Sequence, residues 1–163
     1  MASLLAVDLG VRTGLAAYGG DGRLRWYRSQ NFGSAARLRR AVPALLDAEP
    51  DTTRLVVEGG GPLEKIWRAE AESRGIAVQQ VSAETWRALF LYPREQRSGE
   101  LAKRTAIALA RHVVDWSGIR RPTSLRHDAA EAILTGLWGV LSAGWLHALP
   151  SSILRPSHDA TGR

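Results

Sequence analysis

The chain has 163 residues, of which 45% are hydrophobic and 23% are charged, and it contains no cysteine. These values are typical of one soluble globular domain, and the lack of cysteine excludes disulfides and thiolate metal sites. No stretch is apolar enough for a transmembrane helix, and the start MASLLAVDLG is not typical of a signal peptide. We therefore expect a cytoplasmic protein of a bacterium or phage, with an organelle as an alternative and no membrane partner.

The net charge is +6, with an isoelectric point near 10.7. Lys65 and Lys103 are the only lysines, so arginine supplies nearly all of the positive charge. Arginine suits contacts with phosphate groups, and a basic domain is a natural partner for a polyanion such as nucleic acid.

The first third of the chain predicts three strands and a helix. The apolar run at residues 4–10 predicts a buried strand, and the turn residues 19–22 predict a hairpin that follows it. Together they indicate an antiparallel meander. Residues 34–50 then have helical spacing, with Ser34 as the N-cap and with Pro43 as the position of a kink or break.

The remaining chain alternates strands and helices and ends with three helices. Strands are expected at residues 53–62 and 76–82, and helices at residues 63–75, 82–91, 100–116 and 124–143. This order predicts an α/β fold, with a five-stranded mixed sheet and helices on both faces. The domain is expected to span residues 1–150, followed by a mobile tail at residues 151–163.

Four acids occupy positions where they can converge. Asp8 and Glu58 end two buried strands, at the edge where α/β proteins bind ligands. Asp128 and Glu131 lie three residues apart near the start of the last long helix, and therefore share a face. Such a cluster needs a cation, an arginine or solvent between its members. Two Mg²⁺ ions are one solution, because Mg²⁺ prefers oxygen ligands and metal pairs catalyse phosphodiester hydrolysis. Taken singly, each acid could instead be a turn, cap or solvated residue.

Three stretches resemble the RuvC family of Holliday junction resolvases, within the RNase H-like superfamily. LLAVDLGVRTGLAAY at residues 4–18 is similar to the family's first strand and the strand after it. RLVVEGGG at residues 54–61 is similar to the strand that carries the second acid, and RHDAAEAIL at residues 126–134 is similar to the closing motif. The resemblance spans roughly residues 3–145.

The resemblance implies an endonuclease that makes two symmetric nicks in a four-way DNA junction, as a homodimer with two Mg²⁺ or Mn²⁺ ions per active site. The expected products carry a 5′ phosphate and a 3′ hydroxyl. Lys103 would hold the scissile phosphate, and His127 would assist the water or the leaving oxygen. Glu131 stands where an aspartate is more usual. The implied metal-binding acids are Asp8, Glu58, Asp128 and Glu131.

Basic side chains in the segments expected to flank the acids are candidates for DNA binding, with a solvated loop face as the alternative. These candidates are Arg94, Arg97, Lys103, Arg104, Arg120, Arg121 and Arg126. The family also places an aromatic wedge soon after the second acid. Here the wedge would be Pro62, Leu63, Ile66 or Trp67.

Three other functions share some of these features. An RNA-processing nuclease of the YqgF type would have the same fold and first motif. A branched-DNA-binding module could keep the acids without catalysis. The stretch VDLGVRTG at residues 7–14 also resembles the first phosphate loop of sugar kinases and actin-like ATPases, but 163 residues leave no room for their two-domain cleft.

Overall fold

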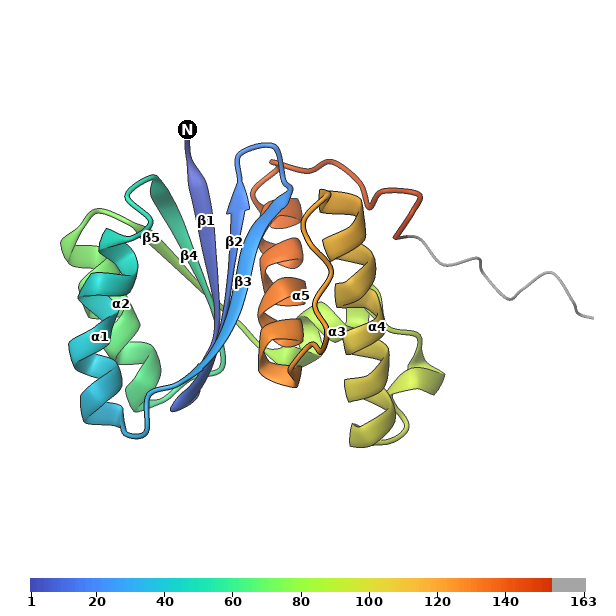
Figure 1. The fold of residues 1–163 in the computed structure, drawn as a ribbon, viewed down its shortest axis with the longest axis horizontal. Coiled ribbons are helices and arrows are strands. Elements are labelled where there is room, and N and C mark those ends of the chain that lie inside the picture. The colour runs from blue at the N-terminus through green and yellow to red at the C-terminus, as the bar shows by residue number, and fades with distance from the viewer. Residues whose placement is uncertain (154–163) are drawn as a thin grey trace, which may run out of the picture.

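In the computed structural model, which describes residues 1–153, five strands form one mixed sheet in the order β3-β2-β1-β4-β5 (Figure 1). β1 pairs antiparallel with β2 and parallel with β4, while β2–β3 is antiparallel and β4–β5 is parallel. The predicted five-stranded mixed sheet is therefore confirmed. The strands are β1 (Ser3–Asp8), β2 (Arg12–Gly19), β3 (Leu24–Asn31), β4 (Thr52–Glu58) and β5 (Ala77–Val81).

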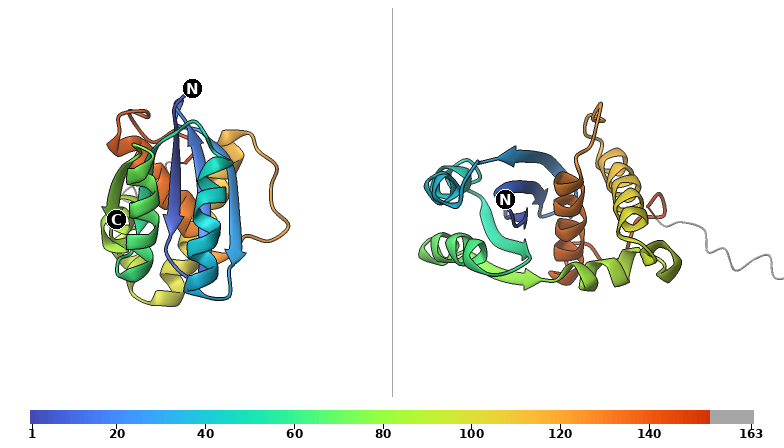
Figure 2. Two further views of the ribbon diagram at one scale, coloured as in Figure 1. Left: turned by 90° about the vertical axis from the view of Figure 1, so that its left-hand side faces the viewer. Right: turned by 90° about the horizontal axis from the view of Figure 1, so that it is seen from below.

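Helices cover both faces of the sheet, as the element order predicts (Figures 1 and 2). α1 and α2 pack on one face, and α3, α4 and α5 pack on the other, with the 3₁₀ helix η1 between α3 and α4. None of the helices among the described residues is long and apolar enough to cross a membrane. The helices are α1 (Ala35–Asp47), α2 (Pro62–Ser73), α3 (Ala83–Phe90), η1 (Pro93–Gln96), α4 (Gly99–Ser117) and α5 (His127–Ser142).

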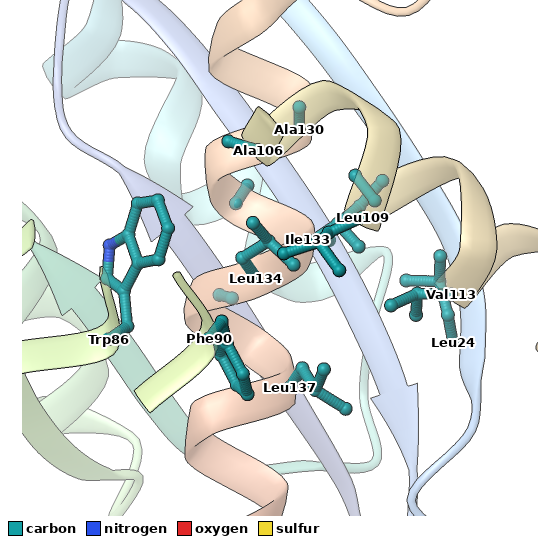
Figure 3. Packing of buried hydrophobic residues seen from close by; sticks show 14 of the residues in the cluster. Leu24, Trp86, Phe90, Ala106, Leu109, Val113, Ala130, Ile133, Leu134 and Leu137 are labelled. Carbon is teal, nitrogen blue, oxygen red and sulfur yellow. The ribbon is translucent and has the colours of Figure 1, made fainter. Parts of the chain in front are cut away.

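The central strands divide their side chains between two cores. In β1, Leu4 and Ala6 face the α3–α5 layer, whereas Leu5 and Val7 face the α1–α2 layer. This alternation is the two-residue period of a strand, and burial on both faces explains why residues 4–7 of β1 are all apolar. Figure 3 shows how α3, α4 and α5 contribute to the larger core through Trp86, Phe90, Leu109, Ile133 and others.

Local signals set several helix boundaries. Ser34 and Ser82 are the N-caps of α1 and α3, since their hydroxyls accept backbone N–H groups of the first turns. α1 continues through Pro43 without the break that this residue suggested. α5 begins at His127, three residues later than expected, because residues 118–126 run back along α4 as a loop (Figure 1).

The expected tail is described only over its first three residues. Residues 151–153 form a turn, and the side chain of Ile153 is buried against the α3–α5 core. The rest of the expected mobile segment, residues 154–163, lies outside the described residues.

Candidate active site

The first two acids lie side by side at the carboxyl ends of neighbouring parallel strands. Asp8 ends β1, Glu58 ends β4, and the two residues are direct partners in the strand register. The chain turns away just after Glu58 at Gly59, whose φ of 112° suits glycine but strains other residues. The sheet edge therefore presents two half-buried carboxylates that belong to one row.

A close approach between β2 and α5 brings the helix acids to this row. Gly14 pairs with Asp8 across β1 and β2, and α5 lies directly over it. A Cβ on Gly14 would lie 1.9 Å from the backbone oxygen of Asp128. Only a residue without a side chain lets the first turn of α5 lie this near to the sheet.

Three of the four predicted acids converge. Asp8, Glu58 and Glu131 each offer a carboxylate oxygen, and these atoms all lie within 4.8 Å of one another. The fourth acid, Asp128, does not belong to this group. It is buried in the first turn of α5, and its Oδ2 accepts a hydrogen bond from Ser29 Oγ at 2.6 Å. The contact with Ser29 could not be predicted from the sequence, because the two residues are 99 positions apart.

The convergence makes Asp8 difficult to ionise. Burial, a hydrogen bond shared with Glu58, and the charges of Glu131, Glu58 and Asp128 raise the pKa of Asp8 to about 10. Among residues 1–153, no arginine, lysine or histidine forms an ion pair with Asp8 or Glu58. Over the described residues, the carboxylates at the strand ends thus have no basic side chain in contact with them.

Glu131 has the opposite environment. Arg87 Nη2 on α3 lies 2.9 Å from Glu131 Oε1, and His127 Nε2 lies 3.1 Å from the same oxygen. Burial favours the neutral acid, but the hydrogen bonds and charges of His127 and Arg87 outweigh burial and lower the pKa of Glu131. Arg87 was missed from the sequence, where nothing distinguishes it from other arginines on helix surfaces.

Two buried polar atoms next to this ion pair have no hydrogen-bond partner among the described residues. They are Arg87 Nε and His127 Nδ1. Buried polar groups are almost always satisfied, so each of these two unpaired atoms carries a cost in free energy in this conformation.

The predicted basic residues are all exposed, but they do not form one group. Figure 3 shows Ala106 beside Ala130 in the core shared by the two helices, and α4 and α5 run in the same direction. Lys103, one turn before Ala106, is therefore level with the first turn of α5.

The arginines nearest to α4's first turn in sequence are Arg94, Arg97 and Arg104, and Arg126 directly precedes α5. Arg121, in contrast, binds Asp115 with an Nε–Oδ1 distance of 2.6 Å. Asp115 is twelve residues beyond Lys103, or about 18 Å along the helix. Arg120 and Arg121 thus lie near the far end of α4, not beside the acids.

The candidate wedge residues differ in accessibility. Trp67 is completely buried in the α1–α2 core and cannot stack on a base in this conformation. Pro62 is exposed at the start of α2, and Leu63 and Ile66 are partly exposed. The first two turns of α2 therefore offer aliphatic rather than aromatic surface.

The donor set fits a hard divalent cation. Asp8, Glu58 and Glu131 supply only oxygen ligands, which Mg²⁺ and Mn²⁺ accept, and thiolate ligands are excluded because the chain has no cysteine. A cation there would offset both the burial and the mutual repulsion that raise the pKa of Asp8.

The strand order and the acid-bearing α5 laid across β1 and β2 define the RNase H-like class of α/β folds. T. thermophilus RuvC, solved in complex with Holliday junction substrate, is similar with a TM-score of 0.63 and 14% identity over 88% of this chain and 96% of that chain. The yeast mitochondrial Holliday junction resolvase Ydc2 is similar with a TM-score of 0.51 and 16% identity over 90% and 82% of the two chains.

Neither a protein-family model nor a curated protein sequence matches the chain. At such low identities the structural likeness establishes the fold. The predicted resemblance to RuvC is thereby confirmed at the level of architecture, over nearly the full length of both proteins.

Proposed function

We propose that the protein is a structure-selective DNA endonuclease that resolves four-way junctions in recombination and repair. The observation that carries this proposal is the meeting of Asp8, Glu58 and Glu131 at the carboxyl edge of a RuvC-like sheet. A basic chain with exposed arginines and a half-buried carboxylate cluster suits a polyanionic substrate.

The residues have distinct roles in the proposed reaction. Asp8, Glu58 and Glu131 would hold two Mg²⁺ or Mn²⁺ ions, with Asp128 as a further ligand. Bound divalent ions supply an activated water and stabilise the leaving 3′ oxygen, which gives a 5′ phosphate and a 3′ hydroxyl.

The remaining side chains act on the substrate and on the acids. Lys103 and the arginines near the start of α4 and α5 would hold the phosphates of the DNA. His127 contacts Glu131 and would assist the water or the leaving oxygen from the first turn of α5.

Symmetric cleavage follows from a homodimer. A four-way junction offers two equivalent strands, and a two-fold dimer presents two equivalent active sites to them. A single protomer would instead nick one strand per encounter and leave the junction joined.

The test is cleavage of a synthetic four-way junction beside a linear duplex of the same sequence, with Mg²⁺, Mn²⁺ or EDTA. We expect paired nicks in the junction alone, sealed afterwards by DNA ligase and absent in EDTA. Asp8→Asn should abolish the nicks, and Asp21→Asn, in the exposed β2–β3 turn, should leave them unchanged.

Other outcomes would replace the proposal. Preferential cutting of RNA would favour an RNA-processing nuclease. Tight junction binding without a cut in either metal would indicate a DNA-binding module that keeps the acids without catalysis. Equal cutting of junction and duplex would remove the structure selectivity.

A further inference from the structure

Four residues form one row across the sheet at the level of the site. The strand register pairs Glu58 with Asp8, Asp8 with Gly14, and Gly14 with Ser29, across β4, β1, β2 and β3. Directly paired residues on neighbouring strands point to the same face of a sheet. Ser29 therefore shares the α5 side with the two strand acids, and Gly14 is the gap between them.

The first turn of α5 sits over that gap. The Asp128 backbone lies against Gly14, so this turn is flanked by Asp8 on one side and by Ser29 on the other. The buried Asp128 carboxylate uses Oδ2 to accept the Ser29 hydroxyl at 2.6 Å. A hydrogen bond to a carboxylate at this length is of the strong, charge-assisted kind.

We infer that Ser29 is a positioning residue that orients Asp128 for the metal centre. The hydroxyl fixes one oxygen of the carboxylate and leaves Oδ1 for a ligand. Without it, the side chain is free to rotate at the edge of a cluster that repels it. Residues that hydrogen-bond to a metal ligand without contacting the metal typically contribute 10–100-fold to metal affinity or activity.

This inference rests on the proposed metal-dependent function, but its test needs no DNA and no turnover. Mn²⁺ binding to the metal-free full-length protein is measured by electron paramagnetic resonance and calorimetry. We expect Ser29→Ala to weaken Mn²⁺ binding about 10-fold. Ser29→Thr, which keeps a hydroxyl on the strand, should restore most of the affinity.

Ser117 provides a matched control. Its hydroxyl also links β3 to a helix, accepting the backbone N–H of Leu24 at 3.0 Å, but at the far end of α4. Ser117→Ala should lower the melting temperature without changing the Mn²⁺ affinity. A purely structural role for Ser29 would make the two alanine variants behave alike.

A double-mutant cycle separates the remaining outcomes. If Ser29 acts through Asp128, adding Ser29→Ala to Asp128→Asn should cause no further loss of Mn²⁺ affinity. Undiminished Mn²⁺ binding by Ser29→Ala would overturn the positioning role alone. Absence of Mn²⁺ binding in the wild type would overturn the proposed function as well. Should Ser29→Ala fail to fold, Ser29→Val against Ser29→Thr gives the same comparison in a pair suited to strands.

Discussion

The strand acids and the helix acid reach the same point in opposite electrostatic states. Asp8 and Glu58 meet with no basic side chain of residues 1–153 in contact, and the pKa of Asp8 is raised. Glu131 faces them from α5 with Arg87 and His127 on one of its oxygens, and its pKa is lowered. Two basic side chains thus compensate the charge of the helix acid, whereas the strand acids are the part of the site that suits the proposed cation.

Removing a strand acid should have the largest effect. Asp8→Asn keeps the shape of the side chain but removes a charged ligand shared by the proposed ions. Metal-dependent stabilisation is worth several kcal/mol, so junction cleavage should fall by about a thousandfold or more. Single-turnover cleavage at saturating protein measures the loss, and full activity of this variant would remove Asp8 from the site.

Separating the helix acids from the strand acids should come next. Gly14→Ala places a Cβ against the Asp128 backbone oxygen and must displace the start of α5. Overpacking typically costs 1–3 kcal/mol, and a clash with backbone should reach about 3 kcal/mol of unfolding free energy. Urea denaturation measures this cost. Unchanged stability would mean that α5 can shift away from β2 freely.

Releasing Glu131 from its basic partner should have a smaller effect. Arg87→Gln should reduce cleavage about 10–100-fold, the range for residues that orient metal ligands. It should also move the acid limb of the pH–rate profile to higher pH, because the guanidinium that lowers the pKa of Glu131 is gone.

Arg68→Gln is the control for this variant. Arg68 pairs with Glu64 and Glu72 on α2, which packs on the opposite face of the sheet from α5. It should leave both the rate and the pH profile unchanged. If the pH–rate profile of Arg87→Gln coincides with that of the wild type, Arg87 does not control the ionisation of Glu131.

The smallest predicted effect concerns stability without metal. Because the pKa of Asp8 is raised from 3.8 to about 10, the folded protein binds more protons than the unfolded chain between these values. Its stability must therefore fall as the pH rises through this window. Between pH 6 and pH 7 in EDTA, the melting temperature of the wild type should fall about 3–5 °C more than that of Asp8→Asn, because one pH unit in this window corresponds to about 1.4 kcal/mol of unfolding free energy. Parallel melting curves would show that Asp8 ionises normally.

The sheet and most of the site could be predicted because their signals are local. Apolar runs that end in an acid and glycine mark β1 and β4, and serine caps mark α1 and α3. Two acids three residues apart on one helix mark the face of α5. Each of these patterns is contained within a dozen residues.

The missing parts depend on contacts between distant segments. Arg87 and Ser29 contact the acids of α5 only because α3 and β3 are placed beside that helix. No local sequence pattern predicts either contact. Arg121 was expected near the acids, since it precedes α5 by a few residues, but the loop carries it to the far end of α4. Trp67 is a sequence candidate for stacking on a DNA base, but its side chain is completely buried in the α1–α2 core.

Our main proposal is that a metal ion joins the strand acids to the helix acid. It is tested most directly by anomalous X-ray diffraction from crystals of the protein soaked in Mn²⁺. We expect an anomalous peak bounded by Asp8, Glu58 and Glu131 that disappears in Asp8→Asn crystals. A wild-type crystal with no peak among these carboxylates at millimolar Mn²⁺, or a peak that survives in Asp8→Asn, would contradict it.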